Sequence, residues 1–404
     1  MNLNLVLVMI LLGGWFCARG AERLRLPGVL GMLACGLLIG GLFGEAAWPA
    51  GLVELEPFLK TFALVVILLR AGLGIRKSVL NRMGRTALLM AVLPCLLEGG
   101  VLTVVLRMWM GFDWAVAGLT GFMLAAVSPA VVVPAMLRLS EEGYGRKHAV
   151  PTLVLAGASV DDVLAITLFA LFVRMAQAES VAVVRTLLEL PVAVLVGILP
   201  GIGVGLGLAH WFSRRMQQVR ATEKTLVLLT LSLFLVQAGD WIQSAALLGV
   251  MTVGFLLLER AEPVAHELAA KLSKIWIFAE ILLFVLIGMQ VDPRVALAAG
   301  PMAVAVVLTG LCARSTGVWL ATAGSDLSNS ERLFCVMAYW PKATVQAALG
   351  GVALSLGLAR GDEILALAVL AILLTAPMGL ICIRRFGPRL LALEADALAE
   401  GPHE

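Results

Sequence analysis

Charged and titratable side chains are scarce in this sequence. Asp, Glu, Lys and Arg make up 14% of the 404 residues, and there are four histidines and two tyrosines against 61% hydrophobic residues. A chain without a long polar run cannot build an ordinary water-soluble surface, so we expect an integral membrane protein. The net charge of +3 is what basic loops on one side of a membrane produce, and it does not indicate a nucleic-acid partner.

Motifs for metal, redox or nucleotide chemistry are also missing. The six cysteines form no CxxC pair and no Cys/His cluster, which argues against disulfides, zinc and redox chemistry. No GxGxxG precedes an Asp at the distance that a nucleotide-binding domain needs. We therefore expect no cofactor and no enzymatic reaction. We assign the histidines no role beyond solvation: His148, His210, His266 and His403.

Long apolar segments, in contrast, fill the chain. About 20 apolar residues cross the hydrocarbon as a helix, and this rule predicts about thirteen spans in an all-α polytopic fold. The first has no basic region before it and Arg19 after it, so we expect a retained span rather than a signal peptide. The expected spans are 2–18, 27–43, 58–74, 86–106, 114–137, 149–173, 188–211, 225–238, 244–258, 272–290, 298–323, 333–356 and 363–382.

The basic residues between these spans predict the orientation. Cytoplasmic loops collect Lys and Arg, and here the alternate connections and the C-terminal tail hold most of them. We therefore expect an external N-terminus and a cytoplasmic C-terminus, in the cell (inner) membrane. The opposite connections hold only five: Arg107, Arg174, Arg185, Arg294 and Arg360.

The most informative feature is the adjacent pair Asp161 and Asp162, in the middle of the apolar stretch 149–172. A carboxylate near the bilayer centre costs at least ~2.5 kcal/mol, and two neighbours repel each other. A polar packing contact is the alternative explanation, but one Asn or Ser would serve it at lower cost. The pair therefore indicates a site that carries ions or protons.

Few other charges lie inside the spans. Lys60 and Arg70 are close enough to their helix ends to reach the interface. The charges deeper in the spans cannot all form ion pairs, because four of them are acids and only two are bases. They are Glu98, Asp161, Asp162 and Glu280, with Arg314 and Lys342.

Two spans carry a proline-containing break. The fifth contains Ser128–Pro134 with Pro129 and Pro134, and the twelfth contains Trp340–Thr344 with Pro341. Proline removes an amide donor, so carbonyls and half-helix ends become exposed near the midplane, where they can ligate a cation. A lone kink is the alternative for either span taken by itself.

The breaks and the buried charges are spaced alike in two parts of the chain. Glu98, Ser128 and Asp161 are separated by 30 and 33 residues, and Arg314, Lys342 and Pro377 by 28 and 35. With seven spans from the fourth to the eleventh, the second copy enters from the opposite face. The spacing therefore predicts an inverted repeat with two crossed broken helices.

Six strings between the second span and the thirteenth form a specific combination: LPGVLGMLACGLLIG (26–40), ILLRAGLG (67–74), LPCLLEGG (93–100), SPAVVVPAML (128–137), GASVDDVLAI (157–166) and WPKATVQAALG (340–350). Together they resemble the cation/proton antiporter superfamily, and within it the NHA clade of sodium/proton antiporters. The resemblance implies a homodimer in which a mobile core carries the ion site past a fixed scaffold.

The domains implied by the resemblance follow from the spans. The scaffold and dimerisation domain would be 1–85 with 213–290, and the ion-transport core 86–174 with 298–385. Residues 185–212 would be a linking helix, and 386–404 a short cytoplasmic tail.

The resemblance also implies roles for single residues. Asp162 matches the aspartate that binds the transported cation (Na⁺ or Li⁺) and the proton, with Asp161 as a second ligand or as the partner of a base. Ser128–Pro134 and Pro341–Thr344 match the unwound segments beside that site, with Ser128 and Thr344 as further ligands.

The buried charges match the clade with one departure. Glu98 and Arg314 match an ion pair across the two repeats, and Lys342 lies in the PKATVQA string. Where an acid is expected to pair with Lys342, this chain has Gln290, so Glu280 is the substitute that we consider.

These residues together predict an exchanger of Na⁺ or Li⁺ for H⁺ that works by alternating access. A site that holds either a proton or a cation, but not both, couples the two flows. Because arginine does not give up its proton in a protein, Arg314 is a permanent counter-charge and we expect electroneutral transport. The alternatives are K⁺/H⁺ exchange and sodium-coupled symport of an organic acid on the same fold.

Overall fold

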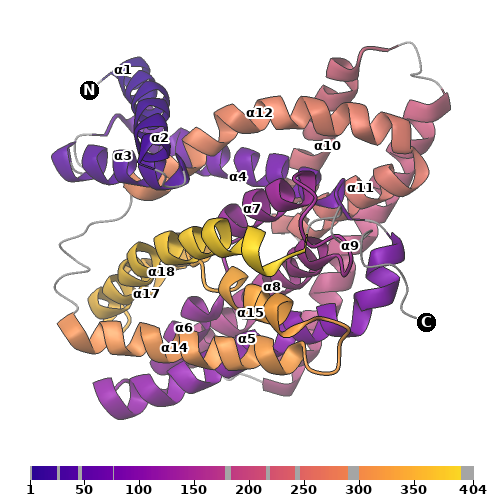
Figure 1. Cartoon of the computed structure of the whole chain (residues 1–404). Coiled ribbons are helices and arrows are strands. Elements are labelled where there is room, and N and C mark those ends of the chain that lie inside the picture. Colours follow the sequence, from indigo (N-terminus) through magenta and orange to yellow (C-terminus); the bar gives the residue numbers. More distant parts are fainter. Residues whose placement is uncertain are drawn as a thin grey trace. The chain divides into compact units, whose positions relative to one another are not determined.

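The computed structural model describes residues 2–24, 28–43, 48–75, 77–177, 183–214, 219–241, 246–289 and 300–392. Within these ranges every regular element is a helix, which confirms the all-α prediction (Figure 1). The chain divides into two compact units. Unit 1 comprises Met1–Ser78 and Pro191–Asp292, and unit 2 comprises Val79–Leu190 and Pro293–Glu404.

Many of the helices are long and apolar enough to cross a membrane. Among the described residues nine meet this condition, and Gly28–Phe43 and Thr344–Leu354 are shorter apolar helices. The protein is therefore a multi-pass membrane protein, whereas the expected count of thirteen spans stays a prediction. The expected span 58–74 corresponds to Ala50–Gly72, which also carries Glu54, Glu56 and Lys60 near its start.

Unit 1 is built from the N-terminal helices and the middle of the chain. α9 (Val183–Arg214) continues into it from unit 2 at Pro191. Its other helices are α1 (Leu3–Val8), η1 (Met9–Gly13), α2 (Gly14–Arg23), α3 (Gly28–Phe43), α4 (Ala50–Gly72), α10 (Ala221–Trp241), α11 (Ala246–Arg260) and α12 (Glu262–Met289).

Helices in unit 1 pack at backbone distance. α3 lies on α12, and α4 lies on α11 and α12 (Figure 1). At the α3–α12 contact, a Cβ on Gly36 would lie 2.1 Å from the carbonyl oxygen of Val285. At the α4–α11 contact, a Cβ on Gly72 would lie 2.1 Å from the carbonyl oxygen of Met251. Only glycine allows these approaches, which replace side-chain packing by direct backbone contact.

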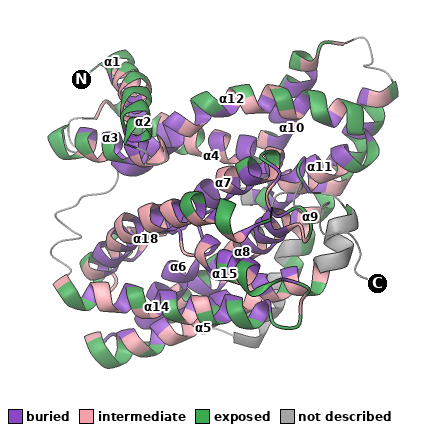
Figure 2. Cartoon of the chain, viewed as in Figure 1, coloured by how far each residue is buried: buried purple, intermediate pink, exposed green. Residues whose placement is uncertain are grey.

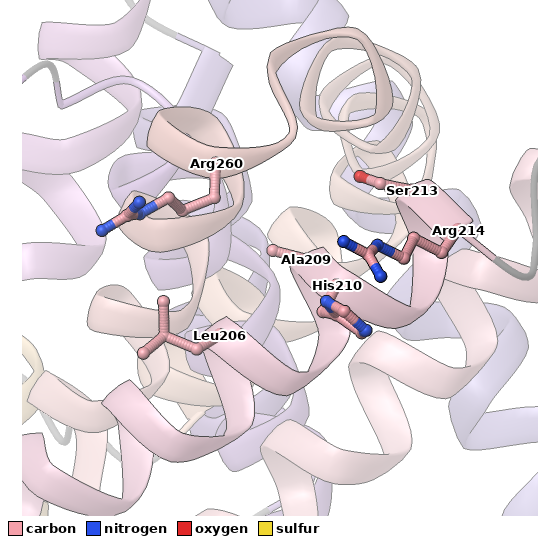
Figure 3. Close-up of a pocket in the computed structure, with 6 residues that line it drawn as sticks. All are labelled: Leu206, Ala209, His210, Ser213, Arg214 and Arg260. Atoms are coloured by element: carbon pink, nitrogen blue, oxygen red, sulfur yellow. The ribbon is translucent and has the colours of Figure 1, made fainter.

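Unit 1 also contains an open pocket of ≈ 440 Å³ at the end of α9 (Figure 3). Figure 3 shows the guanidinium of Arg260 pointing away from Arg214 and His210, so these groups do not converge on one point. None of the residues predicted for the ion site lines it. The lining residues are Leu206, Ala209, His210, Ser213, Arg214 and Arg260.

Unit 2 contains two interrupted helices among continuous ones. α6 (Trp114–Ala125) is followed by α7 (Pro129–Glu141), and α15 (Asn329–Ala338) by α16 (Thr344–Leu349). Its remaining helices are α5 (Lys77–Met110), which starts in unit 1, α8 (Val150–Ala176), α14 (Gly300–Ala321), α17 (Val352–Ser355) and α18 (Gly361–Leu390).

The interrupted helices lie inside unit 2. All residues of α6 from Val116 to Ala125 are buried, as Figure 2 shows by colour. α6 packs on α8, α7 on α8 and α18, and α15 on α14 and α18. The breaks are therefore surrounded by protein, which is the condition for freeing backbone groups at membrane depth.

Candidate functional site

The first broken segment consists of Ala126, Val127 and Ser128, between α6 and α7. Ala126 (ψ 135°) and Ser128 (ψ 108°) are extended, and for Ser128 this is usual because it directly precedes Pro129. The interruption therefore lies just before Pro129, whereas the sequence placed it over Ser128–Pro134. Pro134 lies inside the continuous α7.

The second broken segment runs from Tyr339 to Ala343, between α15 and α16, and contains Pro341. The two segments touch, because the amide of Ser128 donates a hydrogen bond of 2.9 Å to the carbonyl oxygen of Pro341. The hydroxyl oxygens of Ser128 and Thr344 are 3.4 Å apart. Two predicted ligands that are distant in sequence thus lie side by side.

Arg314 on α14 is fully buried and contacts two acids. Its Nε donates to Oε2 of Glu98 on α5. Its Nη2 donates to Oδ2 of Asp161 on α8 over 3.2 Å. The ring of Tyr339, whose centroid is 5.6 Å from the guanidinium carbon, covers the same side chain. The buried charge of the Arg314 guanidinium is tolerated because it lies beside two carboxylates that balance it.

Lys342, in the second broken segment, pairs with the same acid as Arg314. Its Nζ donates to Oε2 of Glu98 over 2.7 Å, and the side chain is 2% exposed. The sequence suggested Glu280 as its partner, but Glu280 belongs to α12 of unit 1, and Gln290 lies outside the described residues. Glu98 therefore serves two cations, which sequence spacing did not indicate.

The adjacent aspartates have different surroundings. Asp161 accepts a hydrogen bond of 3.2 Å from the amide of Val127, in addition to those from Arg314. Asp162 is half-buried, and its Oδ1 is buried without a hydrogen-bond partner among the described residues. Glu98 and Asp161 offset the charges of Arg314 and Lys342, so the charge of Asp162 is the one that no cation of this cluster contacts.

A residue that the sequence analysis missed holds the second broken segment. Oγ1 of Thr375, which is buried on α18, accepts a hydrogen bond of 3.0 Å from the amide of Lys342. Asp161 on α8 does the same for Val127. Thr375 follows Lys342 by 33 residues, and Asp161 follows Val127 by 34. Thr375 thus holds the second broken segment much as Asp161 holds the first, although the sequence spacing had set Pro377 against Asp161.

The sequence analysis did not predict two further polar contacts. Gln346 on α16 is 1% exposed, and its Nε2 donates to carbonyl oxygens at the end of α6. It belongs to the PKATVQA string but had no assigned role. Nδ1 of His148, expected to be only solvated, lies 2.9 Å from Oε2 of Glu331. No pattern in the sequence marks this pair.

The arrangement suits transient binding of a small cation. Hydroxyl and carboxylate oxygens are the ligands that hard cations prefer. Among the described residues no group of three or more His, Cys, Asp or Glu forms a metal site. A cation at Asp162 would therefore depend on one or two carboxylates together with neutral oxygens, and would be cargo rather than a structural ion.

Comparisons with known proteins agree with the geometry. Sodium/hydrogen exchanger 9B1 of Macaca fascicularis is 31% identical over 382 residues, which cover 92% of this chain and 74% of that protein. Sodium/hydrogen exchanger 9B2 of Homo sapiens is 32% identical over 394 residues, covering 91% and 70%. The fold is similar to that of the sodium proton antiporter MjNhaP1 from Methanocaldococcus jannaschii at pH 8, with a TM-score of 0.74, 20% identity and coverage of 95% and 97%.

A family model described as "Sodium/hydrogen exchanger, transmembrane" matches residues 7–385, which is nearly the whole chain. This match and the relatives above 30% identity agree with the buried acids, the paired bases and the crossed broken helices. The chain therefore belongs to the family of transmembrane sodium/hydrogen exchangers.

Proposed function

We propose that this protein is a secondary antiporter that exchanges Na⁺ or Li⁺ for H⁺, and is not an enzyme. The relatives that share about a third of its residues are named sodium/hydrogen exchangers. Asp162 is the principal binding group for cation and proton, with Ser128 and Thr344 as neutral ligands. Asp161, which contacts Arg314 and the Val127 amide, orients the site as the partner of that base.

The observation that carries this proposal is the single uncompensated carboxylate of Asp162. At membrane depth, an acid with a buried, unpaired oxygen is stabilised by binding a proton or a cation that neutralises it. Because the cluster has one acid more than it has bases, binding one H⁺ or one Na⁺ is enough to neutralise it. The two ions therefore compete for Asp162. This competition is the coupling that an exchanger needs.

The same charge count supports electroneutral exchange. Arg314 keeps its proton throughout the cycle, and its charge is matched by acids that it contacts. If Lys342 also keeps its proton beside Glu98, one Na⁺ replaces one H⁺ and no net charge moves. If each cycle moved one net charge, a membrane potential of 100 mV would change the free energy of transport by ~2.3 kcal/mol.

Transport then requires the site to face each side of the membrane in turn. We assign this movement to the core of residues 86–174 and 298–385, and the fixed scaffold to 1–85 and 213–290, joined by the helix of 185–212. The glycine contacts of unit 1, with helices at backbone distance, support a rigid scaffold. We further propose a homodimer formed through this scaffold, with membrane lipid around it.

The proposed location is the cell membrane, with the N-terminus outside and the C-terminus in the cytoplasm. The basic residues support this orientation, because few of them lie on the connections that would then be external. Labelling of single cysteines placed in these connections by a membrane-impermeant thiol reagent tests it. External labelling of the connection that contains Asp113 is expected, and labelling after Arg138 would overturn the orientation.

The test of exchange is proton efflux from acidified proteoliposomes after addition of Na⁺, Li⁺ or K⁺. Wild type is compared with Asp162→Asn and with Asp113→Asn, a control aspartate whose side chain is 83% exposed. Wild type and Asp113→Asn should alkalinise the lumen with Na⁺ and Li⁺, and Asp162→Asn should not. The Na⁺ and Li⁺ arms are run with the potential held at zero by K⁺ and valinomycin.

Other outcomes would favour the alternatives. A response to K⁺ equal to that for Na⁺, measured without valinomycin, would indicate K⁺/H⁺ exchange. No cation-dependent pH change in folded wild-type protein would refute exchange and favour sodium-coupled symport. A Na⁺-dependent current in a planar bilayer that grows with voltage would refute electroneutrality alone.

A further inference from the structure

Gln346 connects the two broken helices of unit 2. It lies on α16, directly after the second broken segment, and is 1% exposed. Its Nε2 donates hydrogen bonds of 2.9 Å to the carbonyl oxygen of Met123 and 3.0 Å to that of Ala126. Met123 lies in the last turn of α6 and Ala126 is the residue that follows the helix, where carbonyls lack helical partners.

The bond to Met123 decides where a neighbouring amide points. In a continuous helix the carbonyl of Met123 would accept from the amide of Val127, four residues later. Here the Val127 amide donates instead to Oδ2 of Asp161 over 3.2 Å. Two acceptors therefore compete for one donor, and Gln346 satisfies the carbonyl that would otherwise draw Val127 back into the helix.

The peptide unit between Ala126 and Val127 is consequently held from both ends. Its oxygen accepts from Gln346 and its N–H donates to Asp161. The next residue, Ser128, is a proposed ligand and contacts Thr344 on the same short helix as Gln346. A shift of this peptide would move the aspartate's donor and the serine together.

The side-chain amide of Gln346 has an energetic cost that a purely structural role does not explain. Oε1 of Gln346 is buried and has no hydrogen-bond partner among the described residues. An unpaired buried acceptor is unfavourable, and an apolar side chain of similar size would avoid it. The two donor bonds must therefore matter enough to keep an amide here.

We propose that Gln346 is a positioning residue for cation exchange, which keeps α6 from extending by a turn so that Val127 N–H stays on Asp161 and Ser128 stays beside Thr344. This inference rests on the proposed exchange at Asp162. Gln346 acts through the backbone of the first broken segment and does not itself have to touch the cation. Its loss should weaken cation binding more than turnover.

The first experiment measures Na⁺-driven proton efflux from proteoliposomes over a range of Na⁺ concentrations. Gln346→Met keeps the volume and removes both donors. We expect its half-saturating Na⁺ concentration to rise about tenfold, which corresponds to ~1.4 kcal/mol, with a maximal rate within about threefold of wild type. Thr120→Val is the matched control, because Thr120 is equally buried on α6 and donates to Val116 of its own helix. It should behave as wild type.

A second variant separates positioning from packing. Gln346→Glu has the same shape, and its protonated form can still donate one hydrogen bond to Met123, whereas the carboxylate would face two carbonyl oxygens. Its rate relative to wild type should therefore fall as the pH rises, while the ratio for Gln346→Met stays flat. The other charged groups of the site are Glu98, Asp161, Asp162, Arg314 and Lys342, and all are present in each protein compared.

The outcomes are distinct from those of the exchange test. If wild type exchanges Na⁺ for H⁺ and folded Gln346→Met has the same half-saturation as wild type, the inference is wrong while the function stands. Equal, pH-independent losses in both Gln346 variants would also overturn it, because they would indicate packing alone. If Gln346→Met does not elute as a folded species, the pH dependence of Gln346→Glu decides.

Discussion

Unit 1 has a buried lysine whose partner is largely in water, whereas unit 2 has a cluster of ion pairs in which both partners are buried. Lys224, 4% exposed, lies 3.6 Å from Glu267, whose side chain is 54% exposed. In unit 2, Arg314, Asp161, Glu98 and Lys342 are all 3% exposed or less. A pair with one end in water stabilises little, whereas removing one partner of a buried pair is strongly unfavourable. Of these two sets of charges, only the cluster of unit 2 lies wholly away from water.

The units also differ in how their helices meet. Unit 1 brings backbones together at Gly36 and Gly72, where no side chain fits between the helices. Unit 2 also has such a contact, at Gly317 beside Pro94, but in addition it interrupts α6 and α15. It satisfies the freed backbone with side chains such as Asp161 and Thr375. The first solution resists change because it depends on close contact. The second places polar groups at membrane depth, where they can bind an ion.

The largest effect that tests this comparison is expected for Glu98→Gln in unit 2. Lys342 then has no acid partner among the described residues and Arg314 loses one of two, which should cost about 3–5 kcal/mol and lower the melting temperature in detergent. The unit 1 counterpart, Glu267→Gln, should change stability by less than ~1 kcal/mol.

A double substitution sharpens this result. Lys342→Met added to Glu98→Gln removes the unpaired cation and should restore part of the stability. Equal melting temperatures for Glu98→Gln and Glu267→Gln would contradict the distinction between the units.

A middle effect is expected for Gly36→Ala in unit 1. The new Cβ would lie 2.1 Å from the carbonyl oxygen of Val285, so α3 and α12 must separate, at a cost of about 1–3 kcal/mol. Gly41→Ala on the same helix meets nothing within 4 Å and should be neutral or slightly stabilising. Thermal melting of both proteins measures the difference, and a stable Gly36→Ala would mean that the close contact is not required.

The smallest effect is expected for His148→Ala in unit 2. Nδ1 of His148 lies 2.9 Å from Oε2 of Glu331, which also accepts from the amide of Ser328 at the start of α15. Losing this contact should cost about 1 kcal/mol. His266→Ala in unit 1 is the control, because this histidine is 64% exposed and 3.6 Å from Glu262. Indistinguishable melting temperatures would show that the pair does not hold α15.

Part of the site was predictable because a charge inside an apolar span is rare. Asp161, Arg314 and Lys342 stood out for that reason, and Pro129 and Pro341 marked the interruptions. The sequence placed the first break over Ser128–Pro134, whereas the structure has it just before Pro129. The reason is that a proline restricts the residue before it more than those after it. Thr375 and Gln346 escaped attention because uncharged polar residues are common in membrane helices.

The sequence by itself determined that this chain is an all-helical membrane protein, and it marked the few acids and bases that lie inside the apolar spans. Composition and spacing are sufficient for that, since a charge inside the hydrocarbon is costly and therefore rare. Only the tertiary structure decided which charges pair: Glu98 with both Lys342 and Arg314, and Asp161 with Arg314, leaving Asp162 uncompensated. Such pairing depends on distances of a few ångströms between helices more than 100 residues apart, which periodicity and spacing along one chain do not contain.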